Sequence, residues 1–212
     1  MEMDYLFDPY YNKEFYGKLT SLTKRRVLVL GASHYCDGCA QCSNCNGCKD
    51  KEGLSLTQQV IRDYLDSTKR YAWKRTHSRF YNAIIDGRSV DRSALVRSMV
   101  FYNYLQAIEG RSAGDSHPEK FHEFRDRDEK CFAQLMNDFK PEVILVWGRN
   151  VRNAFPWDLF KGKIVDGQYS QIYHSEFEGT AVDICFCAHP SSIRHFKKEI
   201  FSKVFRHLDI LK

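Results

Sequence analysis

Apolar runs separated by segments of helical periodicity recur along the chain. The run at 26–31 (RVLVLG) is continuously apolar, which is typical of a strand that is covered on both faces. Three further runs predict strands: 98–103 (SMVFYN), 142–148 (EVILVWG) and 181–187 (AVDICFC).

The segments between these runs predict helices. Ser55 with Gln58, and Ser116 with Glu119, have the spacing of a capping box. The apolar residues of 193–211 are spaced by three or four positions, which predicts an amphipathic helix. Strands that alternate with helices indicate the α/β class. We expect a single domain over 1–212, with a three-layer α/β/α architecture and a four-stranded, mostly parallel sheet.

Polar residues follow the predicted strands. The first strand leads into GASHY (31–35), the second ends at Asn103, the third ends at Gly148, and the fourth leads into AHPSS (188–192). Ligands of parallel sheets bind outside the carboxyl ends of the strands. We therefore expect these segments to meet in one crevice.

Composition and charge narrow the classes of protein. Hydrophobic residues make up 43% of the chain and charged residues 28%, which suits a folded core rather than disorder. The net charge of +5 is small, so its distribution matters more than its size. No apolar run approaches the ~20 residues of a membrane span, and the start of the chain does not resemble a signal peptide. We expect a cytoplasmic monomer that does not bind membranes.

A cysteine-rich insertion occupies 36–48. Thiols that cluster in a reducing compartment bind metal more often than they form disulfides. Zn²⁺ takes four such ligands, and tandem Cys-x-x-Cys steps are also similar to the run that holds a [4Fe–4S] cluster, so both cofactors remain open. A loop without metal and thiol redox chemistry are the alternatives. On the metal interpretation the insertion braces the 33–35 segment, and the predicted ligands are Cys36, Cys39, Cys42, Cys45 and Cys48.

Four segments together resemble the uracil-DNA glycosylase superfamily: GASHY (31–35), VFYNYL (100–105), ILVWG (144–148) and AHPSSI (188–193). They occur in the order of that family's first-strand loop, its base-reading asparagine, its LLWG strand and its HPSPLS loop. The resemblance spans most of the chain from Arg25 onward, and HPS is its most specific part. It implies removal of uracil or a related damaged base from DNA by hydrolysis of the N-glycosidic bond.

The resemblance implies a role for three residues. Asn103 would read uracil, because an amide can donate to O4 and accept from N3–H, whereas cytosine presents the reverse pattern. His189 would donate to O2 of the base and stabilise the negative charge of the leaving group. Tyr35 matches the residue that crowds out the thymine methyl group.

Three positions depart from the family pattern. Ser33 stands where the best-known branch has an aspartate that positions water, which implies slow chemistry or a substitute base. His34 follows in place of proline and is the candidate for that base. Leu56 stands where an aromatic ring would stack on uracil, and packing of a helix is its alternative role.

Candidate DNA contacts lie in two segments. In the closing loop, Ile193 matches the wedge that fills the vacated base stack, with Ser191 and Ser192 on phosphate. The basic stretch 69–79 contains no acidic residue and interleaves cations with aromatic rings. The predicted cationic contacts are Arg194, Lys197, Lys74 and Arg75.

Two other classes of function remain open. The chain would be a nucleic-acid-binding module without catalysis if Ser33 and Leu56 mark a loss of chemistry. It would be a metal-responsive or redox-responsive protein if the thiols of 36–48 are themselves the functional groups.

Overall fold

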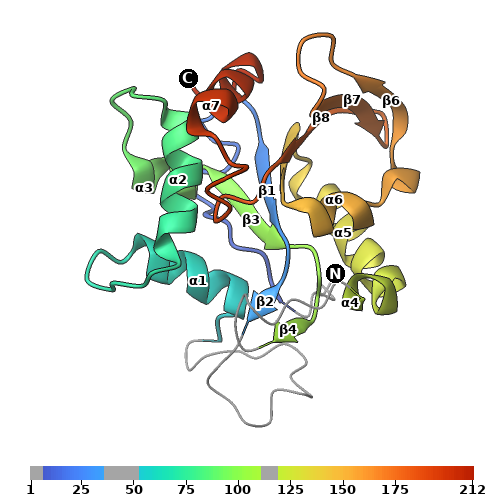
Figure 1. The fold of residues 1–212 in the computed structure, drawn as a ribbon, viewed down its shortest axis with the longest axis horizontal. Coiled ribbons are helices and arrows are strands. Elements are labelled where there is room, and N and C mark those ends of the chain that lie inside the picture. The colour runs from blue at the N-terminus through green and yellow to red at the C-terminus, as the bar shows by residue number, and fades with distance from the viewer. Residues whose placement is uncertain (1–6, 36–52, 111–118) are drawn as a thin grey trace.

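The computed structural model describes residues 7–35, 53–110 and 119–212 (Figure 1). A mixed sheet has the strand order β3-β1-β5-β8-β7-β6. The predicted α/β class is confirmed. The four predicted strands form the parallel part of the sheet, and they are β1 (Val27–Gly31), β3 (Met99–Asn103), β5 (Val143–Trp147) and β8 (Thr180–Cys187).

Two strands of this sheet were not predicted. β7 (Ile172–Phe177) pairs antiparallel with β8, and β6 (Lys161–Val165) pairs antiparallel with β7. Every residue of β6 is exposed, and β7 mixes buried, half-buried and exposed residues. Neither strand therefore has the continuous apolar run used to find the others. The sheet therefore has six strands rather than the expected four.

A second, two-stranded sheet lies beyond the carboxyl edge of the large one. Its strands are β2 (His34–Tyr35) and β4 (Ile108–Gly110), which pair in parallel. Because β2 follows β1 after two residues and β4 follows β3 after four, this pairing ties together the chain segments that leave Gly31 and Asn103.

Helices cover both faces of the large sheet (Figure 1). Odd-numbered residues of β1 such as Val27 face one buried cluster, and even-numbered residues such as Leu28 face the other. The first cluster includes residues of α1 (Leu56–Leu65), α2 (Lys74–Ile85), α3 (Arg92–Arg97) and α7 (Lys198–His207). The second includes residues of α4 (Lys120–Glu123), α5 (Arg125–Phe139) and α6 (Arg149–Ala154), with the short 3-10 helix η2 (Trp157–Leu159) packed against it.

The helix starts were predicted unevenly. The capping box of α1 is confirmed, because the Ser55 hydroxyl accepts from the Gln58 N–H and the Gln58 side chain accepts from the Ser55 N–H. Ser116 lies outside the described residues. The terminal helix begins at Lys198 rather than near Ile193. Before it, the N–H groups of His195 and Phe196 both donate to the Ser192 carbonyl, so this segment forms a separate turn.

Candidate functional site

Asn103 lies directly over Gly31 at the carboxyl edge of the sheet. The two residues are partners in the parallel register of β1 and β3. A Cβ atom on Gly31 would sit 2.2 Å from the Asn103 Oδ1 atom, so only glycine leaves room for the amide in this position. The Asn103 side chain is buried, so its polar atoms need hydrogen-bond partners.

His34 orients the Asn103 amide. The Asn103 Nδ2 atom lies 3.4 Å from His34 Nδ1, and because an amide nitrogen only donates, Nδ1 is the acceptor. The neutral ring then carries its proton on Nε2, which lies 3.5 Å from the Thr57 hydroxyl. The Phe7 ring packs on the imidazole at 4.0 Å. Burial lowers the pKa of His34 to about 3, so the ring is neutral at physiological pH.

A buried glutamine fixes the backbone behind this pair. Gln106 donates from Nε2 to the Asn103 carbonyl at 2.8 Å and accepts from the Phe7 N–H at 2.9 Å. Its own N–H donates to the Asp128 carboxylate, whose pKa burial raises to about 6. Sequence reasoning missed Gln106 and Phe7, because no local pattern shows that residues 99 positions apart in the chain are hydrogen-bonded.

His189 is half-buried just past the end of β8, and its Nδ1 atom is a hydrogen-bond acceptor. Nδ1 accepts from the Ser191 N–H at 3.2 Å and lies 2.6 Å from the Ser191 hydroxyl. An accepting Nδ1 places the proton of the neutral ring on Nε2. Burial lowers the pKa of His189, which favours this neutral form. The Trp147 ring packs edge-on at 5.9 Å and holds the orientation of the imidazole.

The Asn103 and His189 side chains lie over neighbouring strands. The Asn103 side chain covers Gly31 at the end of β1. The His189 side chain covers Gly148 just past the end of β5, and a Cβ atom on Gly148 would lie 3.3 Å from the His189 Cβ atom. β1 and β5 are hydrogen-bonded partners, and adjacent strands are about 4.8 Å apart. The structure thus brings these two predicted residues to the same edge of the sheet.

Arg79 of α2 holds the loop after β8. Its Nη1 atom donates to the carbonyls of Pro190 at 3.4 Å and Ser191 at 3.5 Å. Ser192 is half-buried, and its N–H donates to the His189 carbonyl at 2.8 Å. Ile193 is 67% exposed at the outer end of this loop. The loop is therefore a braced turn with an apolar tip, and Arg194 and Lys197 beyond the tip are exposed.

Replacing Arg79 with alanine should loosen this loop. Its two long hydrogen bonds are partly exposed, so we expect a loss of about 0.5 kcal/mol of unfolding free energy. Amide hydrogen exchange over 188–193 should become faster at the same time. Arg75→Ala is the matched control, since Arg75 is exposed one turn earlier on α2. Equal exchange in both variants would contradict a bracing role.

The remaining predicted site residues differ in their burial and in their contacts. Lys74 donates to the Asp66 carbonyl at 2.5 Å, while Arg75 is exposed. Leu56 is the half-buried first residue of α1, and its neighbour Thr57 is the residue that contacts His34. Ser33 is buried beside His34 in the chain.

The predicted metal site of the cysteine-rich insertion is not tested by the structure. Cys36, Cys39, Cys42, Cys45 and Cys48 fall outside the described residues, as does the side chain of Tyr35. Cys185 and Cys187 are buried in the core with their sulfur atoms 3.8 Å apart, and burial raises the pKa of Cys187. Within the described ranges no cluster of histidine, cysteine or acidic side chains is arranged to hold a metal ion, and no helix is long and apolar enough to cross a membrane.

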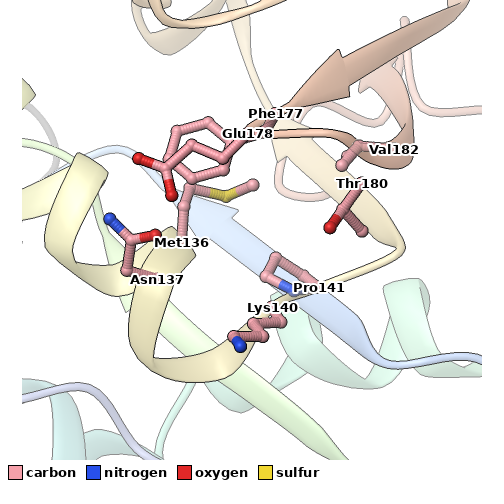
Figure 2. Close-up of a pocket in the computed structure, with 8 residues that line it drawn as sticks. All are labelled: Met136, Asn137, Lys140, Pro141, Phe177, Glu178, Thr180 and Val182. Carbon is pink, nitrogen blue, oxygen red and sulfur yellow. The ribbon is translucent and has the colours of Figure 1, made fainter.

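A hollow lies elsewhere on the molecule, and Figure 2 shows eight residues that line it. It has a volume of about 140 Å³ and lies between the end of α5 and the β7–β8 turn. Thr180 and Val182 at the start of β8 line it, together with Met136 and Lys140. It is therefore near the amino-terminal edge of the parallel strands, opposite to Asn103 and His189.

The fold and these contacts define an α/β protein with an asparagine and a histidine held at the carboxyl edge of its sheet. The sequence matches no protein-family model and no curated protein.

Proposed function

We propose that the protein removes uracil or a related damaged base from DNA, as a member of the uracil-DNA glycosylase superfamily with a sheet extended by β6 and β7. The observation that carries the proposal is the placement of Asn103 and His189 over neighbouring strands, each against a glycine. Glycines at these two positions leave space for the side chains that the chemistry needs.

Asn103 supplies the recognition of the base. His34 Nδ1 takes one amide hydrogen, which prevents the amide from rotating by 180°. The second Nδ2 hydrogen and Oδ1 then form a donor and acceptor pair that matches O4 and N3–H of uracil. A cytosine would leave both groups unpaired at about 1–3 kcal/mol each.

His189 supplies stabilisation of the leaving base. Cleavage of the N-glycosidic bond places negative charge on the base and positive character on the sugar. A neutral imidazole that donates from Nε2 to the base O2 lowers the energy of this state without any proton transfer. The low pKa of His34 makes it a weak base, so its contacts suit the orientation of Asn103 better than activation of water.

Ile193 and the cations near it supply contact with DNA. A flipped base leaves a gap in the stack, and an exposed apolar side chain on a braced loop can fill that gap. Ser191, Ser192, Arg194 and Lys197 flank the wedge, and Lys74 and Arg75 lie on the helix that braces the loop.

A single-turnover assay tests the proposal. Oligonucleotides that carry one uracil, hypoxanthine or xanthine, both single-stranded and duplex, are incubated with excess protein, and abasic sites are cleaved with alkali. We expect product from at least one of these bases. His189→Ala should lower the rate about 100-fold, which is the usual cost of one transition-state donor.

His195→Ala is the matched control for that variant. His195 belongs to the same loop, but its side chain is exposed. It should keep the wild-type rate. Absence of abasic product with all three bases, or equal rates for His189→Ala and the wild type, would refute the enzymatic proposal.

A non-catalytic nucleic-acid-binding module is the second candidate. The observation that favours it is Ser33, which is buried and has no carboxylate with which to position water. The same assay separates the two functions. Binding of uracil-containing DNA without base release, unchanged by His189→Ala, would select the module.

A further inference from the structure

Two stacked aromatic rings lie on the surface at the start of α2. The Tyr71 and Trp73 rings are 5.7 Å apart with an interplanar angle of 14°, and Tyr71 is 45% exposed. The base-release chemistry proposed above uses neither ring. Exposed aromatic pairs that are this well aligned offer a flat face on which another planar group can stack.

The pair is anchored from beneath rather than mobile. Trp73 packs edge-on against His77 at 5.7 Å, and His77 in turn packs on Trp147 at 5.3 Å. His77 is buried, and it also contacts Phe101 of the first core cluster. The Trp73 ring on which Tyr71 stacks is therefore packed against the core, which lowers the entropic cost of binding.

The charge around the rings identifies the partner. No acidic residue occurs between Ser67 and Arg79. Lys69 is paired with Asp63, but Arg70 and Arg75 are exposed and make no ion pair with the residues that the structure describes. Guanidinium groups beside an exposed aromatic face fit a phosphate backbone whose bases are free to stack.

The location connects this surface with the proposed site. Successive ring contacts of 5.7, 5.3 and 5.9 Å lead from Trp73 through His77 and Trp147 to His189. Arg79, on the same helix as Arg75, is bonded to the loop that carries Ile193. Only two rings, His77 and Trp147, thus separate Trp73 from His189.

We propose that Tyr71 and Trp73, with Arg70 and Arg75, form a stacking platform for unpaired bases of the DNA strand that flanks the target, so that single-stranded DNA is the preferred substrate. A base inside a duplex already has neighbours on both of its faces, and only an unpaired base can stack on Tyr71. This inference rests on the proposed function for the direction of the strand, whereas the platform itself binds DNA with or without cleavage.

Binding to uracil-free DNA tests the platform independently of catalysis. The probe is a fluorescein-labelled, mixed-sequence oligonucleotide of about 12 nucleotides, which spans the platform, and the readout is fluorescence anisotropy. Tyr71→Ala should weaken the binding of the single strand about 10-fold, and Tyr71→Phe should keep wild-type affinity because it retains the ring. The plot of log K against log salt has a negative slope, and Arg70→Gln and Arg75→Gln should each make this slope less steep by about 0.7.

Two controls make the result specific. Tyr169→Ala removes a half-buried tyrosine that packs on His207 in another part of the molecule, and it should leave DNA binding unchanged. The same oligonucleotide as a blunt duplex should respond less than about twofold to Tyr71→Ala, because its bases are already stacked.

Failure of this inference differs from failure of the proposed function. Equal loss of affinity for the single strand and the duplex, or no loss with Tyr71→Ala, would overturn the platform even if uracil is released. Selective loss for the single strand by a protein that releases no base would support the platform and refute the glycosylase proposal.

Discussion

On the proposed function, Gly31→Ala is expected to lower the rate of base release about 100-fold while the protein stays folded. The new Cβ would lie 2.2 Å from the Asn103 Oδ1 atom, which no real contact allows, so the amide must swing away. Displacement of a positioned group by about 1 Å costs about 100-fold in rate. We expect this loss in the single-turnover assay on uracil-containing DNA.

The effect on stability should be much smaller than the effect on rate. The new methyl group meets side chains rather than backbone: the end of the Asn103 amide, and the Phe101 Cζ atom at 3.2 Å. The Gly31 backbone is not in a left-handed conformation. Gly167→Ala is the matched control, because nothing lies within 4 Å of the position that its Cβ would occupy. A Gly31→Ala protein with the wild-type rate would show that Asn103 does not read the base.

Acid should destabilise the fold through His77. Burial, and to a smaller extent the nearby His189, lower the pKa of His77 to about 3, and its Nδ1 atom has no hydrogen-bond partner among the described residues. Below the ordinary histidine pKa of 6.5 the unfolded chain takes up a proton that the folded chain refuses. Stability from this residue is therefore fully present above pH 6.5 and is lost as the pH falls toward 3.

His77→Phe isolates this contribution. The unfolding free energy of the wild type should fall by about 2 kcal/mol more than that of His77→Phe when the pH is lowered from 7 to about 5. Urea unfolding at the two pH values measures the difference. The comparison with the variant is needed because Asp128 and His174 have raised pKa values in the folded state. Their contribution to the unfolding free energy grows as the pH falls, which offsets part of the loss from His77.

His195→Phe is the control for that comparison. His195 is exposed, so this variant makes the same substitution without removing a buried imidazole. A wild-type curve parallel to that of His77→Phe would show that the buried imidazole accepts a proton without cost. Such a result would also count against the buried position of His77, on which Trp73 packs.

The parallel strands could be predicted because their physical cause is local. Strands that are covered on both faces must be apolar at every position, and VLVLG and VILVW show this directly. β6 and β7 escaped prediction because an edge strand and its half-covered neighbour keep polar and charged residues such as Lys161 and Glu176. Their place in the sheet depends on pairing with β8, which no local pattern encodes.

The residues proposed for the site could be named from the sequence, but their contacts could not. The strand-end rule and the family resemblance pointed to Asn103 and His189 from the sequence alone. Neither indicated that His34 is an acceptor for the Asn103 amide, nor that Ser191 sets the tautomer of His189. Such roles depend on which atoms come within hydrogen-bond distance after the chain has folded.

The sequence by itself determined the α/β class, the four parallel strands and the polar residues that follow them, because burial imposes apolar runs and turns require short polar segments. Only the tertiary structure decided the partners of those residues: the Asn103 amide over Gly31, Gln106 behind it, and Arg79 across to the Ser191 carbonyl. These contacts join segments that are distant in the chain, and their energies depend on burial and distance, which exist only in the folded molecule.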